Sequence, residues 1–383
     1  MKSGLYIHVP ICASRCIYCD FYSTTLHGVE EAFADAVLRE AKGSPDRTAA
    51  CLPGEIRTLY LGGGTPSQLG GRTLKRMLEE LARIFDLSNV KEATMEVNPE
   101  DVDERFAQEL FDGGSIINRV SMGVQSFVDE ELQFLRRRHN AGKPAEAIRI
   151  LRSNGIQNIS IDLMYGLPLQ TMDSWNRSID TAIALKTQHI SAYCLSVEEN
   201  TPLGKMLKGN RESGNRISLP DDDMCVAMAA VLRKKLQAAG YIQYEISNYA
   251  LPGFHSQHNS AYWDGTPYLG LGPGAHSYDG HATRYWNQTD LKAYLNKVYN
   301  KEDSDGTECE HLTEKDIRNE RVMLGLRTRR GIPAELAVGY EGTVADFISR
   351  GLLEAQNGRL RLTEAGLNFG DEVTRELFAT DGP

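Results

Sequence analysis

The sequence has no long apolar run, no excess of positive charge and few cysteines. No stretch approaches the roughly 18 apolar residues that a membrane helix needs, and the opening segment MKSGLYIHVP is too short to be the apolar core of a secretory signal. A formal net charge of −10 argues against broad affinity for nucleic acid or anionic membranes. Seven cysteines make an odd number for a disulfide framework, and four stand alone in the sequence: Cys51, Cys194, Cys225 and Cys309. These absences predict a cytoplasmic globular protein without a stable membrane span.

The first half of the chain alternates apolar strand-like segments with amphipathic helical ones. Six segments have strand character, at 5–9, 58–61, 93–97, 119–124, 156–163 and 189–195, and helices are expected between them, for example at 29–41, 72–85 and 143–153. Strands joined by helical crossovers are parallel, so the pattern predicts an α/β fold with an open or partial (β/α)6 barrel. Its ligand face lies at the carboxyl ends of the strands. A doubly wound sheet is the alternative, because periodicity does not fix strand order.

At 383 residues the chain suggests two or three units. We expect a barrel at 1–200, an extension at 201–300 with a helix near 221–239 and a Gly/Tyr-rich region at 241–285, and a C-terminal domain at 301–383 that begins with the polar linker KEDSDGTECE.

The C-terminal domain is predicted to be α+β and winged-helix-like. Helices are expected at 313–328, 333–340 and 343–356, followed by a hairpin at 357–367 in which Leu360, Leu362 and Leu367 form a small wing. From His311 to Pro383 the sequence has 10 Lys or Arg against 12 Asp or Glu, so it lacks the basic surface of a DNA-binding module. A packing or partner-docking role is therefore favoured, and no nucleic-acid partner is expected.

Three cysteines follow the first predicted strand at C-x3-C-x2-C spacing: Cys12, Cys16 and Cys19. Thiols on one short loop can converge on one centre. An iron–sulfur cluster is usually held by four cysteines, so three would leave one iron open to a substrate. A structural zinc site needs a fourth ligand, which Cys194 or a distant histidine would have to supply.

This loop resembles the signature of the radical S-adenosylmethionine (SAM) family, and further motifs extend the resemblance over nearly the whole chain. The motifs follow the second to fifth predicted strands: GGGTPS at 62–67, EVNPE at 96–100, GVQSF at 123–127 and DLMYGLP at 162–168. Together with YIHVPIC at 6–12, they resemble the branch that contains oxygen-independent coproporphyrinogen III oxidase and related heme chaperones.

The resemblance implies a set of cofactor ligands. It implies that Cys12, Cys16 and Cys19 hold a [4Fe-4S] cluster whose fourth iron binds the amino and carboxylate groups of SAM, with an electron donor as a further partner. The implied SAM-binding residues are Gly62, Gly63, Gly64 and Thr65 beside the methionine part, Glu96 and Arg137 at its charged groups, Gln125 and Asp162 at the ribose, and Tyr6 near the cluster. A tight turn at the glycines and a surface ion pair at Arg137, which Arg136 and Arg138 flank, are the structural alternatives.

Two features distinguish the oxidase from the heme chaperones. The oxidase carries a further cysteine two residues after its third cluster ligand, where this sequence has Phe21, and it has a longer segment before the cluster than the eleven residues here. In the chaperone branch the motif HNxxYW marks heme trafficking, and HNSAYW at 258–263 matches it. His258 is therefore our hypothesis for a heme contact, with His255 and His276 as competitors.

These features predict heme as a ligand and an unidentified protein as the recipient of that heme. The rival interpretation is a radical SAM oxidoreductase that acts on coproporphyrinogen III or a related tetrapyrrole. A transcriptional regulator that uses the predicted wing is the third class, and the missing basic surface makes it the weakest.

Overall fold

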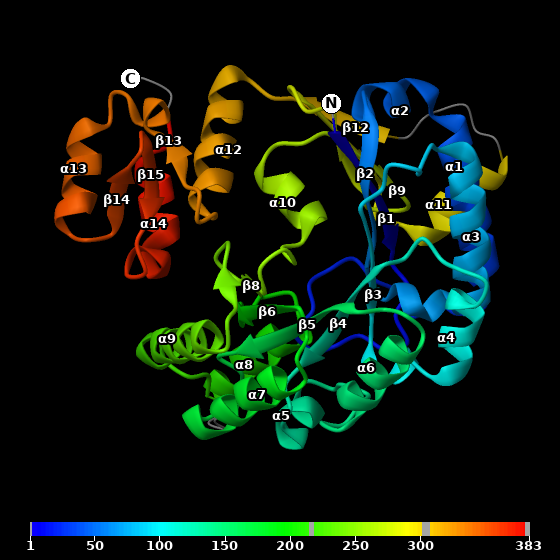
Figure 1. Ribbon diagram of the computed structural model, residues 1–383, viewed down its shortest axis with the longest axis horizontal. Coiled ribbons are helices and arrows are strands. Elements are labelled where there is room, and N and C mark those ends of the chain that lie inside the picture. The colour runs from blue at the N-terminus through cyan, green and yellow to red at the C-terminus, as the bar shows by residue number, and fades with distance from the viewer. Residues whose placement is uncertain (1, 214–217, 301–306, 380–383) are drawn as a thin grey trace.

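The computed structural model describes residues 2–213, 218–300 and 307–379. Within these residues, twelve strands form one sheet in the order β12-β11-β10-β9-β1-β2-β3-β4-β5-β6-β8-β7. Figure 1 shows this curved sheet with helices along its outer side and the C-terminal elements as a separate group beside it. The two end strands, β12 and β7, do not pair with each other, so the sheet is open.

The six predicted βα strands form the centre of this sheet. They are β1 (Lys2–Val9), β2 (Glu55–Gly63), β3 (Glu92–Val97), β4 (Arg119–Gln125), β5 (Asn158–Tyr165) and β6 (His189–Cys194). Each pairs with the next in parallel and in chain order. This order confirms the partial (β/α)6 barrel and excludes the doubly wound alternative, in which the order reverses part-way through the sheet.

Helices cover the outer face of the sheet, and the longer ones present an apolar stripe to it. They are α1 (Glu30–Gly43), α2 (Pro45–Cys51), α3 (Gly71–Ile84), α4 (Glu104–Phe111), α5 (Asp129–Phe134), α6 (Lys143–Ser153) and α7 (Met172–Ala184). In α3, for example, Leu74, Leu78 and Leu81 are buried at intervals of four and three residues. Each such leucine contributes roughly 1.5–3 kcal/mol of burial free energy.

The extension adds strands to both edges of the barrel. Its elements are α8 (Pro202–Ser213), α9 (Asp222–Ala238), β7 (Ile242–Gln243), β8 (Asn248–Ala250), α10 (Gln257–Trp263), β9 (Tyr268–Leu271), β10 (His276–Tyr278), β11 (Thr283–Asn287), α11 (Leu291–Asn300) and β12 (Thr307–His311). Strand β8 pairs antiparallel with β6 at one edge, and β9 pairs parallel with β1 at the other.

The predicted linker at 301–310 falls partly outside the described residues, namely at 301–306. Its remaining residues belong to β12, which pairs with β11 in the main sheet, so this part is a strand and not a linker. The division of the chain at residues 200 and 300 stays a prediction.

The C-terminal domain comprises α12 (Glu314–Leu326), β13 (Ile332–Pro333), α13 (Glu341–Ser349), β14 (Leu353–Gln356), β15 (Arg359–Leu362) and α14 (Gly370–Glu376). Its sheet has the order β13-β15-β14. Leu360 and Leu362 lie in the β14–β15 hairpin, whereas Leu367 lies in the following 3-10 turn. None of the described helices has the length and apolar content of a membrane span.

One helix predicted in this domain is too long, and another is a 3-10 turn. The predicted helix at 343–356 ends at Ser349, because Gly351 takes a φ of +71° and the Leu352 N–H bonds to the Phe347 carbonyl, which closes the helix. The remaining apolar residues form β14. The predicted helix at 333–340 is a 3-10 turn at Ala334–Ala337, with Gly339 at a φ of +88° behind it.

Candidate functional site

The three-cysteine loop leaves the carboxyl end of β1 and is anchored at its base. The Cys12 N–H donates to the Thr24 carbonyl at 2.9 Å, and Ile11 bridges to Thr24. All three thiols are free and partly buried. Burial raises the pKa of Cys12 and Cys19, and the neighbouring thiols raise it further, so these two thiolates need a positive charge nearby. A metal cluster supplies that charge, and the donor set therefore fits one.

The described residues do not form a site for a single metal ion. Among residues 2–213, 218–300 and 307–379, no three His, Cys, Asp or Glu side chains lie where one metal ion would contact them all. An iron–sulfur cluster distributes its thiolates over separate irons, so this finding concerns single ions.

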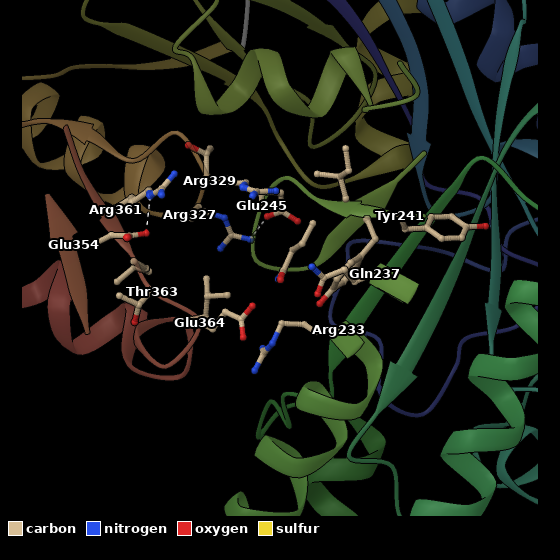
Figure 2. A pocket seen from close by; sticks show the side chains of 16 residues that line it. Arg233, Gln237, Tyr241, Glu245, Arg327, Arg329, Glu354, Arg361, Thr363 and Glu364 are labelled. Atoms are coloured by element: carbon tan, nitrogen blue, oxygen red, sulfur yellow. Dashed lines mark hydrogen bonds and ion pairs between the residues drawn. The ribbon is translucent and has the colours of Figure 1, made fainter. Parts of the chain in front are cut away.

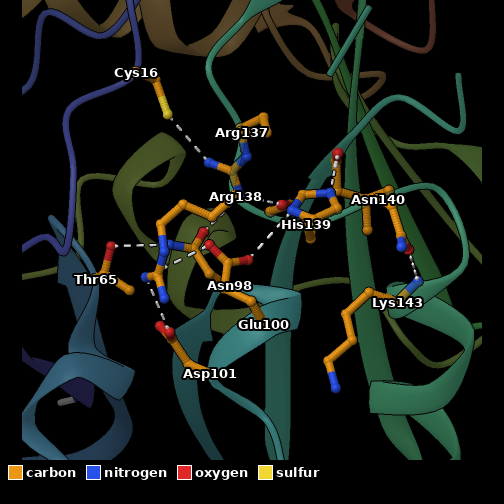
Figure 3. Close-up of polar contacts among 12 residues, drawn as sticks. Cys16, Thr65, Asn98, Glu100, Asp101, Arg137, Arg138, His139, Asn140 and Lys143 are labelled. Carbon is orange, nitrogen blue, oxygen red and sulfur yellow. Dashed lines mark hydrogen bonds and ion pairs between the residues drawn. The ribbon is translucent and has the colours of Figure 1, made fainter. Parts of the chain in front are cut away.

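A chain of polar side chains connects two of the cysteines. The Thr65 hydroxyl donates to the Cys12 sulfur at 3.4 Å, and Asn98 donates to that hydroxyl at 3.3 Å. The Arg137 guanidinium donates to the Asn98 oxygen at 2.6 Å and to the Cys16 sulfur at 3.3 Å, as Figure 3 shows. Sequence reasoning missed Asn98, although it lies in EVNPE directly after β3. Its amide supplies both the donor and the acceptor that this network needs.

Arg137 is the arginine of RRRHN that reaches the cysteine loop. Arg138 instead pairs with Asp101 at 3.4 Å on the surface, and Arg136 takes a φ of +57° in the preceding turn. Burial alone would lower the pKa of Arg137, but the nearby Tyr18 and Cys16 raise it above its usual range, so the cation is retained. Its Nε is buried without a partner, which leaves a donor for an anionic group such as a carboxylate.

The glycines after β2 are required by close packing around the cysteine loop. A Cβ on Gly64 would lie 2.9 Å from the Val9 carbonyl oxygen and 3.0 Å from the Cys12 sulfur. Gly63 has a φ of +109°, and its N–H donates to the Glu96 carboxylate at 3.1 Å. The tight-turn interpretation therefore holds for this segment, and contact of Gly62, Gly63 and Gly64 with SAM stays a prediction.

Polar side chains predicted to bind SAM lie in the carboxyl halves of three adjacent strands. Glu96 is the penultimate residue of β3 and accepts a hydrogen bond from the Tyr60 hydroxyl at 2.7 Å. Gln125 ends β4 with a φ of +67°, where a register shift after Gly123 turns the chain. Asp162 in β5 accepts a hydrogen bond from Ser121 at 3.4 Å. Burial raises the pKa of Glu96 to about 7 and that of Asp162 to about 6. Shifts of this size are typical of carboxylates at functional sites.

His258 and Tyr6 lie deeper, in an aromatic group inside the barrel. His258 is 2% exposed, and its ring nitrogens contact the Thr58 hydroxyl at 2.8 Å and the Tyr262 hydroxyl at 3.0 Å. Burial lowers the pKa of His258 to about 3. Tyr6 stacks on His258 with ring centroids 6.3 Å apart, and its hydroxyl contacts His8 at 3.0 Å. Both residues are thus placed as a hydrogen-bonded core, and their cofactor contacts stay predictions.

The competing histidines are accessible. His255 is exposed and stacks on Tyr244 at 4.3 Å, and His276 is exposed and stacks on Trp286 at 5.9 Å. Phe21, two residues after Cys19, is 72% exposed, which is unusual for a large apolar side chain.

Comparison with known proteins identifies relatives along the whole chain. Residues 6–182 match the Radical SAM superfamily, and residues 312–369 match the HemN C-terminal domain. The sequence is 34% identical to the heme chaperone HemW of Mycobacterium tuberculosis (strain ATCC 25618 / H37Rv), over 98% of this chain and 94% of the relative. It is 33% identical to HemW of Bacillus subtilis (strain 168), over 97% of this chain and 98% of the relative, and 34% identical to HemW of Escherichia coli (strain K12), over 92% and 89%.

A solved structure shares the fold. Coproporphyrinogen III oxidase (HemN) from Escherichia coli, a radical SAM enzyme, matches with a TM-score of 0.80 over 99% of this chain and 90% of that one, at 21% identity. At that identity the match establishes the architecture alone. The near full-length similarity to several HemW proteins establishes more: this chain belongs to the HemW family of radical SAM proteins.

Proposed function

We propose that this protein is a heme chaperone that binds a [4Fe-4S] cluster, SAM and heme, and transfers heme to a recipient protein. The observation that carries the proposal is the 31–34% identity, over nearly the whole chain, to proteins named heme chaperone HemW. The three-cysteine loop with Phe21 after it supports the same assignment.

In this proposal Cys12, Cys16 and Cys19 hold the cluster, and Gly62, Gly63, Gly64, Thr65, Glu96, Gln125, Arg137, Asp162 and Tyr6 surround SAM. When bound, the cluster supplies an electron that can cleave the sulfonium of SAM, and a separate electron donor must replace it. Arg137 and Thr65 stabilise the thiolates by donating to the Cys16 and Cys12 sulfurs. Glu96 accepts the methionine ammonium once its carboxyl group has lost its proton, near pH 7. A reducing compartment keeps the three thiols available, which is why we assign the protein to the cytoplasm.

The heme contact of His258 is part of the proposal and carries a specific structural cost. Both ring nitrogens are hydrogen-bonded, so coordination of iron requires the Nε2 to give up its contact with the Tyr262 hydroxyl. Heme titrated into the His258→Ala protein should then give a changed absorption spectrum. The His255→Ala protein is the matched comparison, because His255 is exposed and stands three residues away.

The decisive experiment separates the chaperone from the oxidase. Anaerobically reconstituted protein loaded with SAM is given heme in one sample and coproporphyrinogen III in another, and products are separated by chromatography. We expect stoichiometric heme capture that a hemoprotein acceptor reverses, with no conversion of coproporphyrinogen. Formation of protoporphyrinogen together with 5′-deoxyadenosine would establish the oxidase instead.

The cluster assignment has its own test. Iron analysis after reconstitution should give about four irons per chain in the wild type, and far fewer in the Cys12→Ala, Cys16→Ala and Cys19→Ala proteins. Cys309→Ala, an exposed and isolated cysteine, is the control and should retain the full iron content. Full clusters in all variants would contradict the ligand assignment.

A further inference from the structure

A pocket lies between the C-terminal domain and the barrel extension. Its volume is about 320 Å³, and Figure 2 shows side chains from the C-terminal domain on one side and from α9 and the β7 region on the other. Small-molecule sites often lie at such domain interfaces and have volumes of roughly 300–1,000 Å³. The pocket is lined by four arginines, Arg233, Arg327, Arg329 and Arg361, and three glutamates, Glu245, Glu354 and Glu364.

Two of these arginines are already neutralised. Arg327 pairs with Glu245 at 3.2 Å, and Arg361 pairs with Glu354 at 2.6 Å. Within the described ranges, the guanidinium groups of Arg233 and Arg329 make no hydrogen bond or ion pair, and neither does the Glu364 carboxylate. Two free cations against one free anion leave the pocket positive, although the whole chain carries a net charge of −10. Such a pocket favours a ligand with more than one negative group.

Apolar and aromatic side chains stand between the charges, together with the polar side chains of Gln237, Gln243, Thr328 and Thr363. Tyr241, Ile242, Tyr249, Leu362 and Leu367 contribute to the lining. A ligand that satisfies both features combines an apolar part with anionic groups.

One wall connects the pocket to the HNSAYW segment. The guanidinium of Arg327 lies over the ring of Trp263 at 4.7 Å, and its Nε is buried without a partner. Arg327 thus contacts two groups at once. It forms an ion pair with the nearly fully buried Glu245, and it packs on Trp263, the last residue of α10. Through this contact, one lining residue of the pocket touches the segment to which the sequence assigned heme contact.

We propose that this pocket binds the propionate-bearing edge of heme, with Arg233 and Arg329 as partners of the two carboxylates. The inference rests on the proposed function and locates its ligand. Figure 2 shows Arg233 and Arg329 at opposite ends of the pocket, with Arg327 and Glu245 between them. A volume near the lower limit for ligand sites suits one edge of the macrocycle, and the remainder extends past the apolar rim.

A chemical double-mutant cycle tests this assignment. Heme and heme dimethyl ester, which lacks the propionate charges, are titrated into reconstituted full-length wild type, Arg233→Gln, Arg329→Gln and Lys234→Gln. Wild type should bind heme about tenfold more tightly than the ester, as expected for charge-assisted contacts. Each pocket variant should weaken heme binding about threefold, because it removes one of the two carboxylate partners, and should leave the ester affinity unchanged. Lys234→Gln removes the same charge from an exposed neighbouring position outside the lining and should behave as wild type.

Removal of a negative charge from the pocket provides a second measurement of heme affinity. Glu364→Gln removes the unpaired carboxylate from the wall and should tighten heme binding about threefold without affecting the ester, because one repulsion is lost. Equal affinities of wild type for heme and its ester, or an unchanged ratio in both arginine variants, would overturn the propionate site while the chaperone function stands. Failure of wild type to capture heme at all would contradict the proposed function itself.

Discussion

At the scale of single residues, Glu96 carries a titration that the pH dependence of stability should report. Its folded pKa of about 7 lies above the ordinary 4.5 because the carboxyl group is buried. Between these two values the folded state holds a proton that the unfolded chain has released, so stability falls as pH rises from about 4.5 to 7.

We expect the Glu96→Gln apoprotein to lose less stability than wild type between pH 5 and pH 8, by about 2 kcal/mol. Glutamine stays neutral, and its single oxygen can still accept from the Gly63 N–H while its NH2 group donates to the Tyr60 hydroxyl oxygen. Urea unfolding at several pH values measures the difference. Asp162, whose pKa burial raises to about 6, keeps part of the slope in both proteins. Glu146→Gln, at an exposed surface pair, is the control, and an equal slope in all three proteins would contradict the titration.

Gly64 tests whether the glycine run is required by packing. Gly64→Ala would place a Cβ 2.8 Å from the Pro10 carbonyl carbon and 3.0 Å from the Cys12 sulfur, and backbone atoms cannot move aside. We expect the apoprotein to lose about 1–3 kcal/mol of unfolding free energy and to incorporate less iron on reconstitution. Gly342→Ala, in α13 with no atom within 4 Å of the added Cβ, should be neutral or stabilising. Equal unfolding free energies of the two variants would show that close packing is not the reason for a glycine at position 64.

How much of the site the sequence predicts depends on whether a residue belongs to a pattern. The cysteine spacing and the strand-end motifs are local, so they placed Cys12 and Glu96 correctly at the carboxyl edge of the sheet. Asn98 was missed because one polar residue after a strand has no periodicity, and its role depends on Thr65 and Arg137, which lie 33 and 39 residues away.

At the scale of elements, local sequence patterns predicted the strands β1–β6 but not the bounds of the strands in the extension. The central strands are buried, largely apolar runs between helical segments, which a sequence shows directly. Strands β9 to β12 have three to five residues each and pair with partners fixed by the fold, so their pattern is too short to recognise. The helix predicted at 343–356 failed because one glycine turns the chain and the apolar residues after it fit either structure.

Helix α10 is held on the barrel by a carboxylate that no sequence pattern revealed. Glu92, 3% exposed at the start of β3, accepts hydrogen bonds from the Gln257 and His258 N–H groups, both at 2.9 Å. Glu92→Ala leaves these buried N–H groups without an acceptor and should cost about 2–4 kcal/mol of unfolding free energy. Hydrogen exchange at residues 257–259 should accelerate.

A substitution of a surface glutamate is the control for Glu92→Ala. Glu104→Ala removes an exposed carboxylate from the first turn of α4, where it pairs with Arg149, and should cost less than about 1 kcal/mol. Retained protection at 257–259 in Glu92→Ala would show that apolar packing, and not the carboxylate, holds α10.

At the scale of the whole molecule, a few polar contacts join the C-terminal domain to the barrel extension. The Ile246 N–H donates to the Arg327 carbonyl at 3.1 Å, and the Arg329 N–H donates to the Tyr244 carbonyl at 3.0 Å. Beside these backbone bonds, the Arg327 guanidinium pairs with Glu245, which is 2% exposed and whose pKa burial raises. Domain attachment should therefore depend on the charge of one buried carboxylate.

Burial raises the pKa of Glu245, and the Arg327 cation lowers it. Because Arg327→Ala removes this cation, the pKa of Glu245 should rise further. The carboxyl group then holds its proton to higher pH than in wild type, so the loss of stability should be smaller at pH 5.5 than at pH 8, where burial of an unpaired charge should cost about 3 kcal/mol. Denaturant unfolding at both pH values measures this, and limited proteolysis should release the C-terminal domain faster at pH 8 only. Arg350→Ala, whose partners Asp346 and Glu372 lie on the surface, should change neither quantity. An equal loss at both pH values would mean that Arg327 acts through its packing on Trp263, and not through the charge of Glu245.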